Sequence, residues 1–212
     1  MGNNKKVRNS LLLVILLSII AISLGISVAV FNYLGNGTTN NVIQTGRIIF
    51  SYSDAENPTG NGINIANAMP ISDSLGKVQA GVYEYFDFSV TASTTNTDIA
   101  YEIVANKQEN STMPDDYVKI YLTEFNGNTE VETPLTGGAV VPTYSELKDT
   151  TNPGLTGKSI YFGEVKAGEV AYGKSFRLRM WIKDSKSDGF DYDSVNEKEY
   201  TVKVNVSALG AN

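Results

Sequence analysis

Beyond residue 46, apolar and polar residues alternate along the chain, interrupted by short clusters of Gly, Pro, Asn and Asp. In KSFRLRMWIK, residues 174–183, every second residue from Phe176 to Ile182 is apolar. A period of two places successive side chains on opposite faces of a β-strand. On this pattern we predict strands over residues 47–53, 62–67, 83–92, 98–106, 117–125, 158–165, 174–183 and 199–208.

Short strands of this kind, separated by turn-forming residues, are typical of two antiparallel sheets packed as a sandwich. Only Thr143 and Glu146, which have capping-box spacing, indicate a helix, and it is limited to a turn or two. The stretch 126–157 is rich in Thr, Pro and Gly and predicts an irregular excursion between strands. The predicted fold class is therefore all-β, an extracellular two-sheet antiparallel sandwich over residues 46–212.

An uncharged, mostly apolar run occupies residues 11–31, ahead of the strand-rich part. A membrane-spanning helix needs about 20 apolar residues, so this run is long enough to be one. Three basic residues precede it: Lys5, Lys6 and Arg8. Positive charge beside a span stays on the cytoplasmic side. We therefore expect a basic stub with a signal peptide or membrane anchor over residues 1–34, and a flexible linker over 35–45.

The sequence leaves open whether this run is cleaved after export. The hydrophobic region of a cleaved signal is about 7–15 residues long, and the stretch from Leu11 to Ile26 is at that limit. Ser27 and Ala29 supply the small-x-small pattern of a processing site, whereas the apolar run continues through Phe31. Cleavage near Ala29 predicts a secreted or matrix protein. Retention predicts a single-pass membrane protein with its C-terminal domain outside.

Charge and missing residue types narrow the functional classes. The net charge is −6, and all 23 acidic residues lie beyond residue 53. Such a surface repels phosphate backbones, so we expect no nucleic-acid partner. The chain contains neither histidine nor cysteine. Because imidazole and thiolate are the usual zinc ligands and catalytic bases or nucleophiles, this excludes Ser-His-Asp and Cys-His hydrolases and classical zinc proteases. We expect no enzyme and no cofactor.

One acidic cluster, DSKSDGFDYD at residues 184–193, is a weak candidate for calcium binding. Asp184 and Asp188 take positions one and five of an EF-hand-like loop. Positions three and twelve, which need oxygen ligands, are instead Lys186 and Val195. The alternative is a solvated connection, since Asp and Gly are common in turns. The carboxylates that the calcium interpretation uses are Asp184, Asp188, Asp191 and Asp193.

Trp181, the single tryptophan, falls on the polar face of its strand, opposite Phe176 and Leu178. An outward-facing aromatic ring can bind a sugar or anchor an interface. It can equally lie under a loop. Four basic residues raise a similar question, because they form either a basic stripe on adjoining strands or cross-strand pairs with acids. They are Arg177, Arg179, Lys183 and Lys203.

Several motifs follow one another in an order known from one protein family. A basic N-terminus and a long apolar run end in SVAVF, and the strand motif TGRIIFSYS follows. NAMPISD, FDFSVTA and IAYEIVA come next. In this order the chain, from about residue 5 to residue 207, resembles the TasA/camelysin-like family of exported Gram-positive surface and biofilm-matrix proteins.

The resemblance implies a jelly-roll-like sandwich, export by the general secretory route and assembly into extracellular matrix fibres. It implies processing by a dedicated signal peptidase after Ala29, with Ser27 at the −3 position. It also implies that the freed segment Val30–Gly46 of one subunit completes the sheet of the next. The camelysin branch has been described as metalloproteases, an activity that a chain without histidine does not support.

Together, these observations favour a non-enzymatic cell-surface or extracellular structural protein. We expect a matrix-fibre or adhesin-like subunit that self-assembles or binds other surface proteins. An uncleaved chain also contacts the membrane through residues 11–31. The alternative is a membrane-tethered glycan- or peptide-binding module that uses Trp181.

Overall fold

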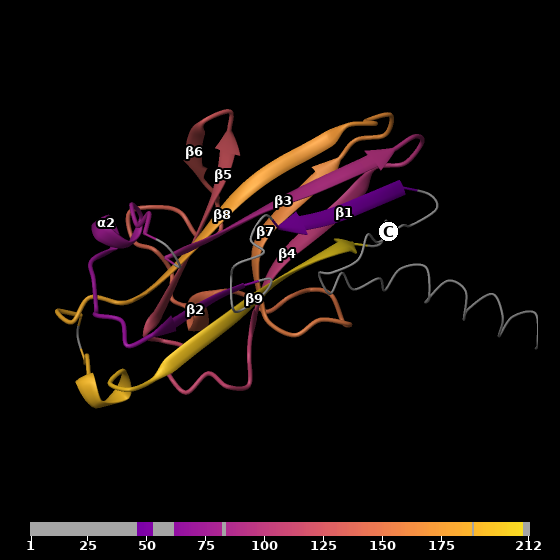
Figure 1. Cartoon of the computed structure of the whole chain (residues 1–212). Helices are drawn as coiled ribbons and strands as arrows, with labels where there is room; N and C mark the ends of the chain where they lie inside the picture. The colour runs from indigo at the N-terminus through magenta and orange to yellow at the C-terminus, as the bar shows by residue number, and fades with distance from the viewer. Residues whose placement is uncertain (1–45, 53–61, 82–83, 188, 210–212) are drawn as a thin grey trace, which may run out of the picture. The chain divides into compact units, whose positions relative to one another are not determined.

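The computed structural model describes four segments of the chain, which Figure 1 draws in colour. They are residues 46–52, 62–81, 84–187 and 189–209. The chain divides into two units, Met1–Tyr33 and Leu34–Asn212, and every described residue belongs to the second. The N-terminal helix predicted over 11–31 and the linker predicted over 35–45 lie outside the described residues. Within the described segments, no helix has the length and apolar character needed to cross a membrane.

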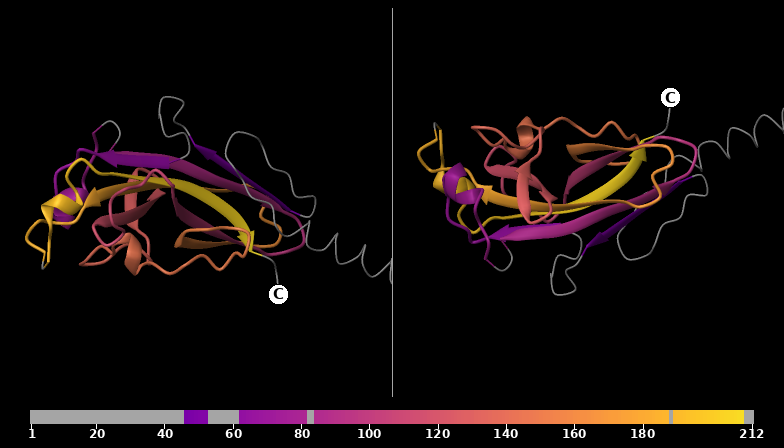
Figure 2. Two further views of the ribbon diagram at one scale, coloured as in Figure 1. Left: turned by 90° about the horizontal axis from the view of Figure 1, so that it is seen from below. Right: turned by 90° about the horizontal axis from the view of Figure 1, so that it is seen from above.

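The described residues form two antiparallel sheets that lie face to face (Figure 2). Sheet A has five strands, in spatial order β1 (Gly46–Tyr52), β3 (Tyr85–Thr94), β8 (Tyr172–Ile182), β5 (Val118–Asn126) and β6 (Thr129–Glu132). Sheet B has four, in spatial order β2 (Gly62–Ala66), β9 (Glu199–Leu209), β4 (Ile99–Lys107) and β7 (Lys158–Val165). The predicted all-β fold, a sandwich of two antiparallel sheets, is confirmed.

The core lies between the sheets and is built from every second residue of the facing strands, as the alternation predicts. In sheet A, Phe88 of β3 is paired with Phe176 of β8, and their stacked rings are 5.3 Å apart. Tyr161 of β7, in sheet B, meets Phe176 edge-on at 4.9 Å. The two sheets are thus joined by aromatic contacts as well as by aliphatic packing. Among the fully buried residues are Phe86, Val90, Val118, Ile120, Leu178, Val202 and Val204.

Polar contacts also join the two sheets, and one of them lies deep in this apolar core. The hydroxyl groups of Tyr101 on β4 and Tyr172 on β8 lie 2.6 Å apart and share a hydrogen bond. Tyr101 is fully buried, and burial raises the pKa of its hydroxyl above the usual value. The pair therefore satisfies two phenol groups that would otherwise be buried without partners.

The outer face of sheet B is partly covered by the residues that precede β7. Glu102 on β4 is fully buried there. Its carboxyl group accepts hydrogen bonds from Ser159 Oγ, from Thr150 Oγ1 at 2.9 Å and from the backbone N–H of Thr151 at 3.2 Å. Asn152 also donates to Ser207 Oγ of β9. These hydrogen bonds fix an irregular segment onto the sheet through polar contacts.

All eight strands predicted from alternation are present, and one further strand was missed. Strand β6 lies within the stretch predicted to be irregular, and pairs with β5 across Gly127, whose φ is +62°. A two-residue hairpin turn with φ above zero at its first central position favours Gly there. The predicted capping box is confirmed at the 3₁₀ turn η1 (Tyr144–Glu146), where the N–H of Thr143 donates to Glu146 Oε2 at 2.6 Å.

Candidate functional site

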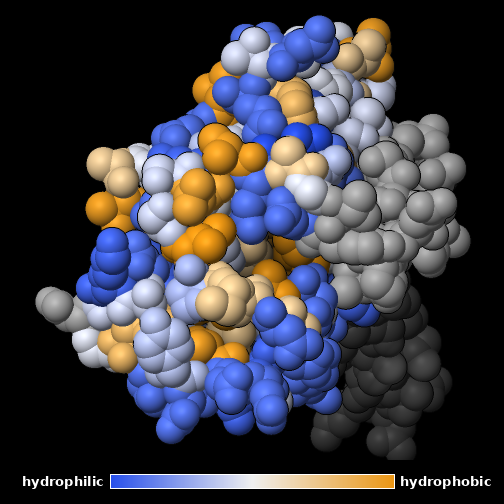
Figure 3. Space-filling model, turned by 60° about the vertical axis from the view of Figure 1, so that its left-hand side comes forward, coloured by the Kyte–Doolittle hydropathy of each residue, from blue (hydrophilic) through white to orange (hydrophobic). Residues whose placement is uncertain are grey.

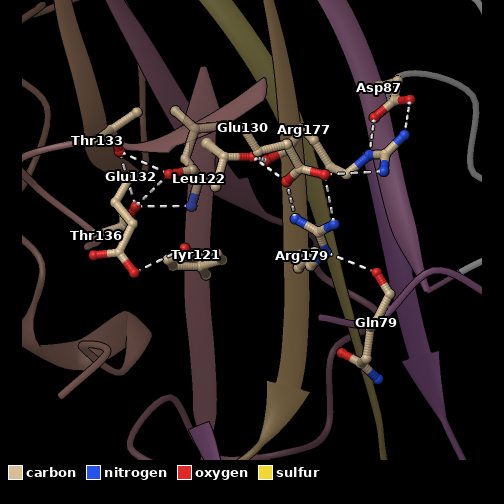
Figure 4. A network of polar contacts seen from close by, with 11 residues as sticks. Gln79, Asp87, Tyr121, Leu122, Glu130, Glu132, Thr133, Thr136, Arg177 and Arg179 are labelled. Atoms are coloured by element: carbon tan, nitrogen blue, oxygen red, sulfur yellow. Dashed lines mark hydrogen bonds and ion pairs between the residues drawn. The ribbon is translucent and has the colours of Figure 1, made fainter. Parts of the chain in front are cut away.

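The outer face of sheet A carries a network of paired charges (Figure 4). Arg177 on β8 donates from Nε and Nη2 to the two carboxylate oxygens of Asp87 on β3, at 2.6 and 2.7 Å. Its Nη1 lies 3.2 Å from Oε1 of Glu130 on β6. The guanidinium also stacks over Tyr85, 3.8 Å from the ring centroid. The Asp87 carboxylate raises the pKa of the Arg177 guanidinium, so this side chain is a fixed, paired cation.

Arg179, two residues further along β8, shares the carboxylate of Glu130. Its Nη1 and Nη2 donate to Glu130 Oε2 and Oε1 at 2.5 and 3.0 Å, and its Nε donates to the carbonyl oxygen of Gln79 at 2.7 Å. The Arg179 side chain is only 4% exposed. Its hydrogen bonds hold the pKa of Glu130 below the usual range. Glu130 therefore ties the short strand β6 to β8, reaching across β5.

The basic stripe, one of the two arrangements that the sequence left open for these residues, does not form, because its members lie in different sheets. Lys203 is on β9 in sheet B, whereas Arg177 and Arg179 are on β8 in sheet A. Strands that follow one another in the chain need not be neighbours in a sandwich, and the stripe prediction assumed that they were. Lys183 lies 3.9 Å from the Asp116 carboxylate. The alternative, cross-strand pairing with acids, is what the two arginines show: Arg177 pairs with Asp87 on the neighbouring strand β3, and both arginines pair with Glu130 across β5.

Trp181 lies on the outer face of sheet A, yet its side chain is buried and only 2% exposed. Tyr121 of the neighbouring strand meets the indole edge-on at 6.1 Å, and Val141 and Ile71 pack against the same cluster. Gly76 is so close that a Cβ atom added there would be 2.2 Å from Cδ2 of the indole. Trp181 therefore lies beneath other residues and does not offer an open ring face to a sugar.

Residues 71–79 lie against Trp181 and cover it. This segment, the 71–79 cover, includes the short helix α2 (Asp73–Gly76). Hydrogen bonds hold this 71–79 cover to β8 and to residues 132–141. They join Ile71 N to Ile182 O at 3.1 Å, Val141 N to Asp73 Oδ2 at 2.9 Å, Lys77 Nζ to Glu132 Oε1 at 2.6 Å and to Gly138 O at 2.7 Å, and Arg179 Nε to Gln79 O at 2.7 Å. Because these partners are distant in sequence, no local pattern predicts the cover.

A cavity of about 400 Å³ lies beside Trp181, between the end of β2 and the end of β8. Two buried polar atoms of its lining residues, Trp181 Nε1 and Gln79 Oε1, have no hydrogen-bond partner within the described part of the chain. Glu84 is the one ionisable side chain that the described residues contribute to the lining, and its Oε2 accepts from the N–H of Gly81 at 2.6 Å. The lining therefore carries one carboxyl group, and the two unsatisfied atoms are buried beneath it rather than open to the cavity.

The outer side of the 71–79 cover exposes apolar side chains among polar ones. Figure 3 turns the α2 side of the molecule forward and shows separate hydrophobic groups among hydrophilic side chains. Four side chains from the cover and its surroundings are largely exposed: Met69 at 76%, Leu75 at 59%, Val78 at 69% and Val140 at 73%. Exposed apolar side chains that are scattered in this way are common on protein surfaces and do not by themselves mark a contact surface.

The ends of the sheets provide a second kind of surface. The edge strands of sheet A are β1 and β6, and β7 is one edge strand of sheet B. A groove of about 360 Å³ lies where β6 and the residues after it approach β7. Its apolar lining is partly exposed, with Val131 at 49%, Leu135 at 37% and Phe162 at 47%. Strand edges and apolar grooves are the features that partner strands use.

The acidic residues at 184–193 serve as local turn acceptors in the described part of the chain. Asp184 Oδ1 accepts from the N–H of Lys186 at 3.0 Å. Asp191 caps the 3₁₀ turn η2 (Tyr192–Ser194), accepting from Asp193 N and from Ser194 Oγ, and the latter bond lowers the pKa of Asp191. Asp188 lies outside the described residues. No three Asp or Glu side chains gather around a common point within the described segments.

The proposed processing residues Ser27 and Ala29 lie outside the described residues. Two features were missed by sequence reasoning, the role of Glu130 and the cavity beside Trp181. For Glu130 no local signal exists, because it lies in the stretch predicted to be irregular and pairs with arginines about 50 residues further along the chain. For the cavity no local signal exists, since its lining comes from four separate stretches of chain.

Comparison with known proteins does not assign the chain to a family. No protein-family model matches it, and no significant similarity was found to a curated protein or to a solved structure.

Proposed function

We propose that this chain is a non-enzymatic structural protein of the bacterial surface or extracellular matrix, which assembles into fibres through its sheet edges. It is exported by the apolar run 11–31, and remains tethered by it or is released by cleavage near Ala29. The sequence resemblance to TasA/camelysin-like proteins and the lack of histidine and cysteine support this interpretation.

The observation that carries the proposal is the pair of unlike edges of sheet A. Strand β1 pairs with β3 on one side and, among the described residues, has no strand on its other side. The opposite edge, at β6, borders the apolar groove that Val131 and Phe162 line. If the β1 edge of one subunit meets the β6 edge of the next, the contact is head-to-tail. Such a contact continues into a filament when it does not close a ring.

The connectivity supports the jelly-roll-like class that the resemblance implies. The order β2-β9-β4-β7 faces the order β3-β8-β5-β6, so that most consecutive strands alternate between the two sheets. Double-sheet jelly rolls combine two Greek keys in this way. Strand β1 is then an addition to the eight-stranded arrangement, placed directly after the predicted linker. This position suits a segment that can pair with its own β3 or with that of a neighbouring subunit.

The test is to express the full chain in a Gram-positive host and to follow both processing and assembly. Intact-mass analysis of the surface and medium fractions reports whether residues 1–29 are retained. Electron microscopy and light scattering report whether the protein forms filaments. We expect filaments or large linear oligomers, and a protein that remains monomeric in every fraction would contradict the proposal.

Charge substitutions at the groove locate the contact. Val131→Lys and Phe162→Lys place a cation on residues that are about half exposed, so the fold tolerates them, and we expect both to abolish assembly. Val170→Lys is the matched control, because Val170 is 70% exposed and lies on the loop before β8, away from the groove. Loss of assembly in all three variants alike would argue against a specific groove contact.

A further inference from the structure

Strand β6 makes different contacts with its two faces. Val131 lines the groove between β6 and β7 together with Glu124, its partner on β5, and Glu124 accepts from Tyr161 of sheet B at 3.0 Å. Glu130 and Glu132 flank Val131, so their side chains point the opposite way, to the outer face of sheet A. There both are hydrogen-bonded to residues of β5 or β8. A strand of four residues therefore takes part in the groove and in the outer face at once.

The 71–79 cover is attached to Glu132. Lys77 Nζ of the cover donates to Glu132 Oε1 at 2.6 Å and to the carbonyl oxygen of Gly138 at 2.7 Å. The same carboxylate accepts from the Tyr121 hydroxyl group at 3.0 Å and from the N–H of Gly138 at 2.9 Å. The hydrogen bond from Lys77 holds the pKa of Glu132 below its usual range, so the carboxylate is charged at neutral pH. The cover is therefore held to the end of β6 by a charged hydrogen bond.

A second attachment of the cover runs through Glu130. Two nitrogens of the Arg179 guanidinium donate to the Glu130 carboxylate, and the third, Nε, donates to the carbonyl oxygen of Gln79 at 2.7 Å (Figure 4). A guanidinium is planar and rigid, so the carboxylate that holds two of its nitrogens also sets the direction of the third. Lys77 and Gln79, in the second half of the cover, are thus both fixed through β6.

Strand β6 itself is weakly supported. It has four residues, lies at the edge of sheet A and, among the described strands, pairs with β5 alone. Val131, its only apolar residue, is 49% exposed. An edge element with so few buried contacts opens at a lower free energy than the core does. An ordered β6 presents its carboxylates to the outer face and Val131 to the groove, whereas an opened β6 presents neither.

We propose that β6 couples the groove to the 71–79 cover. A second copy of the chain that packs against Val131 keeps β6 ordered and thereby holds the cover closed over Trp181, and a closed cover in turn favours the contact. Such coupling is reciprocal, because both events need the same ordered strand. The role of the second copy rests on the proposed function, whereas the link between β6 and the cover is a property of one chain and is tested in the monomer.

The first experiment measures the link between β6 and the cover in one chain. The full chain carrying Phe162→Lys, a groove substitution on β7, provides monomers in which β6 is unchanged. Hydrogen exchange read by mass spectrometry reports the opening of residues 129–132, and acrylamide quenching of Trp181, the single tryptophan, reports the opening of the cover. Lys77→Met removes the donor to Glu132. We expect it to raise the quenching and to speed the exchange of β6 about fivefold, as the loss of one ion pair predicts.

Two further variants make this result specific. Lys77→Arg retains a cationic donor and should restore the parent rates. Lys166→Met removes a cation that pairs with Asp98 and Glu164 rather than with β6, and it should change neither signal. The exchange of β6 in Lys77→Met is the decisive signal, because Lys77 is not part of that strand and a purely local loosening of the cover would not reach it.

The second experiment compares filaments of the parent protein with the Phe162→Lys monomers. Residues 71–79 should exchange at least about threefold more slowly in filaments, and Lys77→Met should reduce this difference. Filaments whose cover exchanges as fast as that of monomers would overturn the coupling and leave the assembly standing. Raised quenching in Lys77→Met with unchanged exchange in β6 would overturn the link itself. A parent protein that never assembles would overturn the role of the second copy together with the proposed function, and the Lys77→Met monomers would still decide the link within one chain.

Discussion

The carboxylate of Glu130 and the guanidinium of Arg179 form a two-point ion pair that spans three strands of sheet A, with nitrogen–oxygen distances of 2.5 and 3.0 Å. Glu130 is on β6 and Arg179 is on β8, with β5 between them. Strand β6 is only four residues long and three of these residues are exposed, so few contacts hold it besides its backbone bonds to β5 and the contacts of Glu132. The ion pair therefore supports the edge of sheet A where the proposed contact groove begins.

Replacing Glu130 by Gln should lower the free energy of unfolding by about 1–3 kcal/mol at neutral pH, because a nearly buried Arg179 loses its counterion. The pKa of Glu130 is lowered in the folded state, so its stabilising effect is fully present above the unfolded pKa of about 4.5. It is lost as pH falls through the lower folded pKa. Urea unfolding from pH 7 to pH 3 should show parent and variant converging at the acid end.

A matched control for this prediction is Glu132→Gln. Glu132 is more exposed than Glu130, at 44% against 27%, and pairs with Lys77 rather than with a buried arginine. We expect a smaller loss of stability from it. An equal loss of stability in both variants would mean that pairing with the arginines does not make Glu130 more stabilising than Glu132.

Replacing Gly76 by Ala should destabilise the protein by about 1–3 kcal/mol, since the new methyl group overlaps the indole of Trp181. The 71–79 cover must then lift or Trp181 must shift, and its fluorescence should move to longer wavelength as water reaches the ring. Leu75→Ala, in the same turn but 59% exposed, is the control and should leave both quantities nearly unchanged. A Gly76→Ala variant with parent stability and fluorescence would show that the cover does not press on Trp181.

Replacing Glu102 by Leu should cost about 3 kcal/mol or more, because Ser159, Thr150 and Thr151 lose their acceptor in a buried place. Glu102→Gln keeps an oxygen acceptor and should cost less. Thermal unfolding of both variants tests this order, and hydrogen exchange at Thr151 locates the effect. A leucine variant as stable as the glutamine variant would contradict the role given to these hydrogen bonds.

Adding calcium should leave the midpoint of thermal unfolding unchanged. Asp191 already accepts from Ser194 Oγ and from the N–H of Asp193, and Asp184 accepts from the N–H of Lys186. Scans with millimolar calcium and with a chelator measure this directly. A clear rise with calcium that is lost in Asp191→Ala would instead support the candidate site of Asp184, Asp188, Asp191 and Asp193.

Much of the fold was predictable because burial alternates with a period of two on strands that have one wet face. Phe176, Leu178 and Met180 are buried where the pattern placed them. Strand β6 was missed because its sequence, TEVE, is short and mostly polar, so no apolar face marks it. Its partner β5 and the Gly127 turn define it, and both act through the backbone.

The candidate sites were less predictable, because they depend on contacts between distant segments. Alternation placed Trp181 on the outer face of its strand, which is where it lies. Its burial depends on Gly76 and Val141, neither of which belongs to a strand. In the same way, the pattern could not assign Arg177 and Lys203 to different sheets, because it specifies faces and not strand order.

The strand order of sheets A and B has a consequence for how the molecule comes into being. Strand β2 pairs with β9 and β3 pairs with β8, so early strands of both sheets depend on the latest ones. A chain that emerges N-terminus first, from a ribosome or through a translocation channel, cannot close either layer until its last strands have appeared. Pairing between such distant segments is slow, and the nascent polypeptide therefore stays unfolded, and able to pass through a narrow channel, for most of its synthesis.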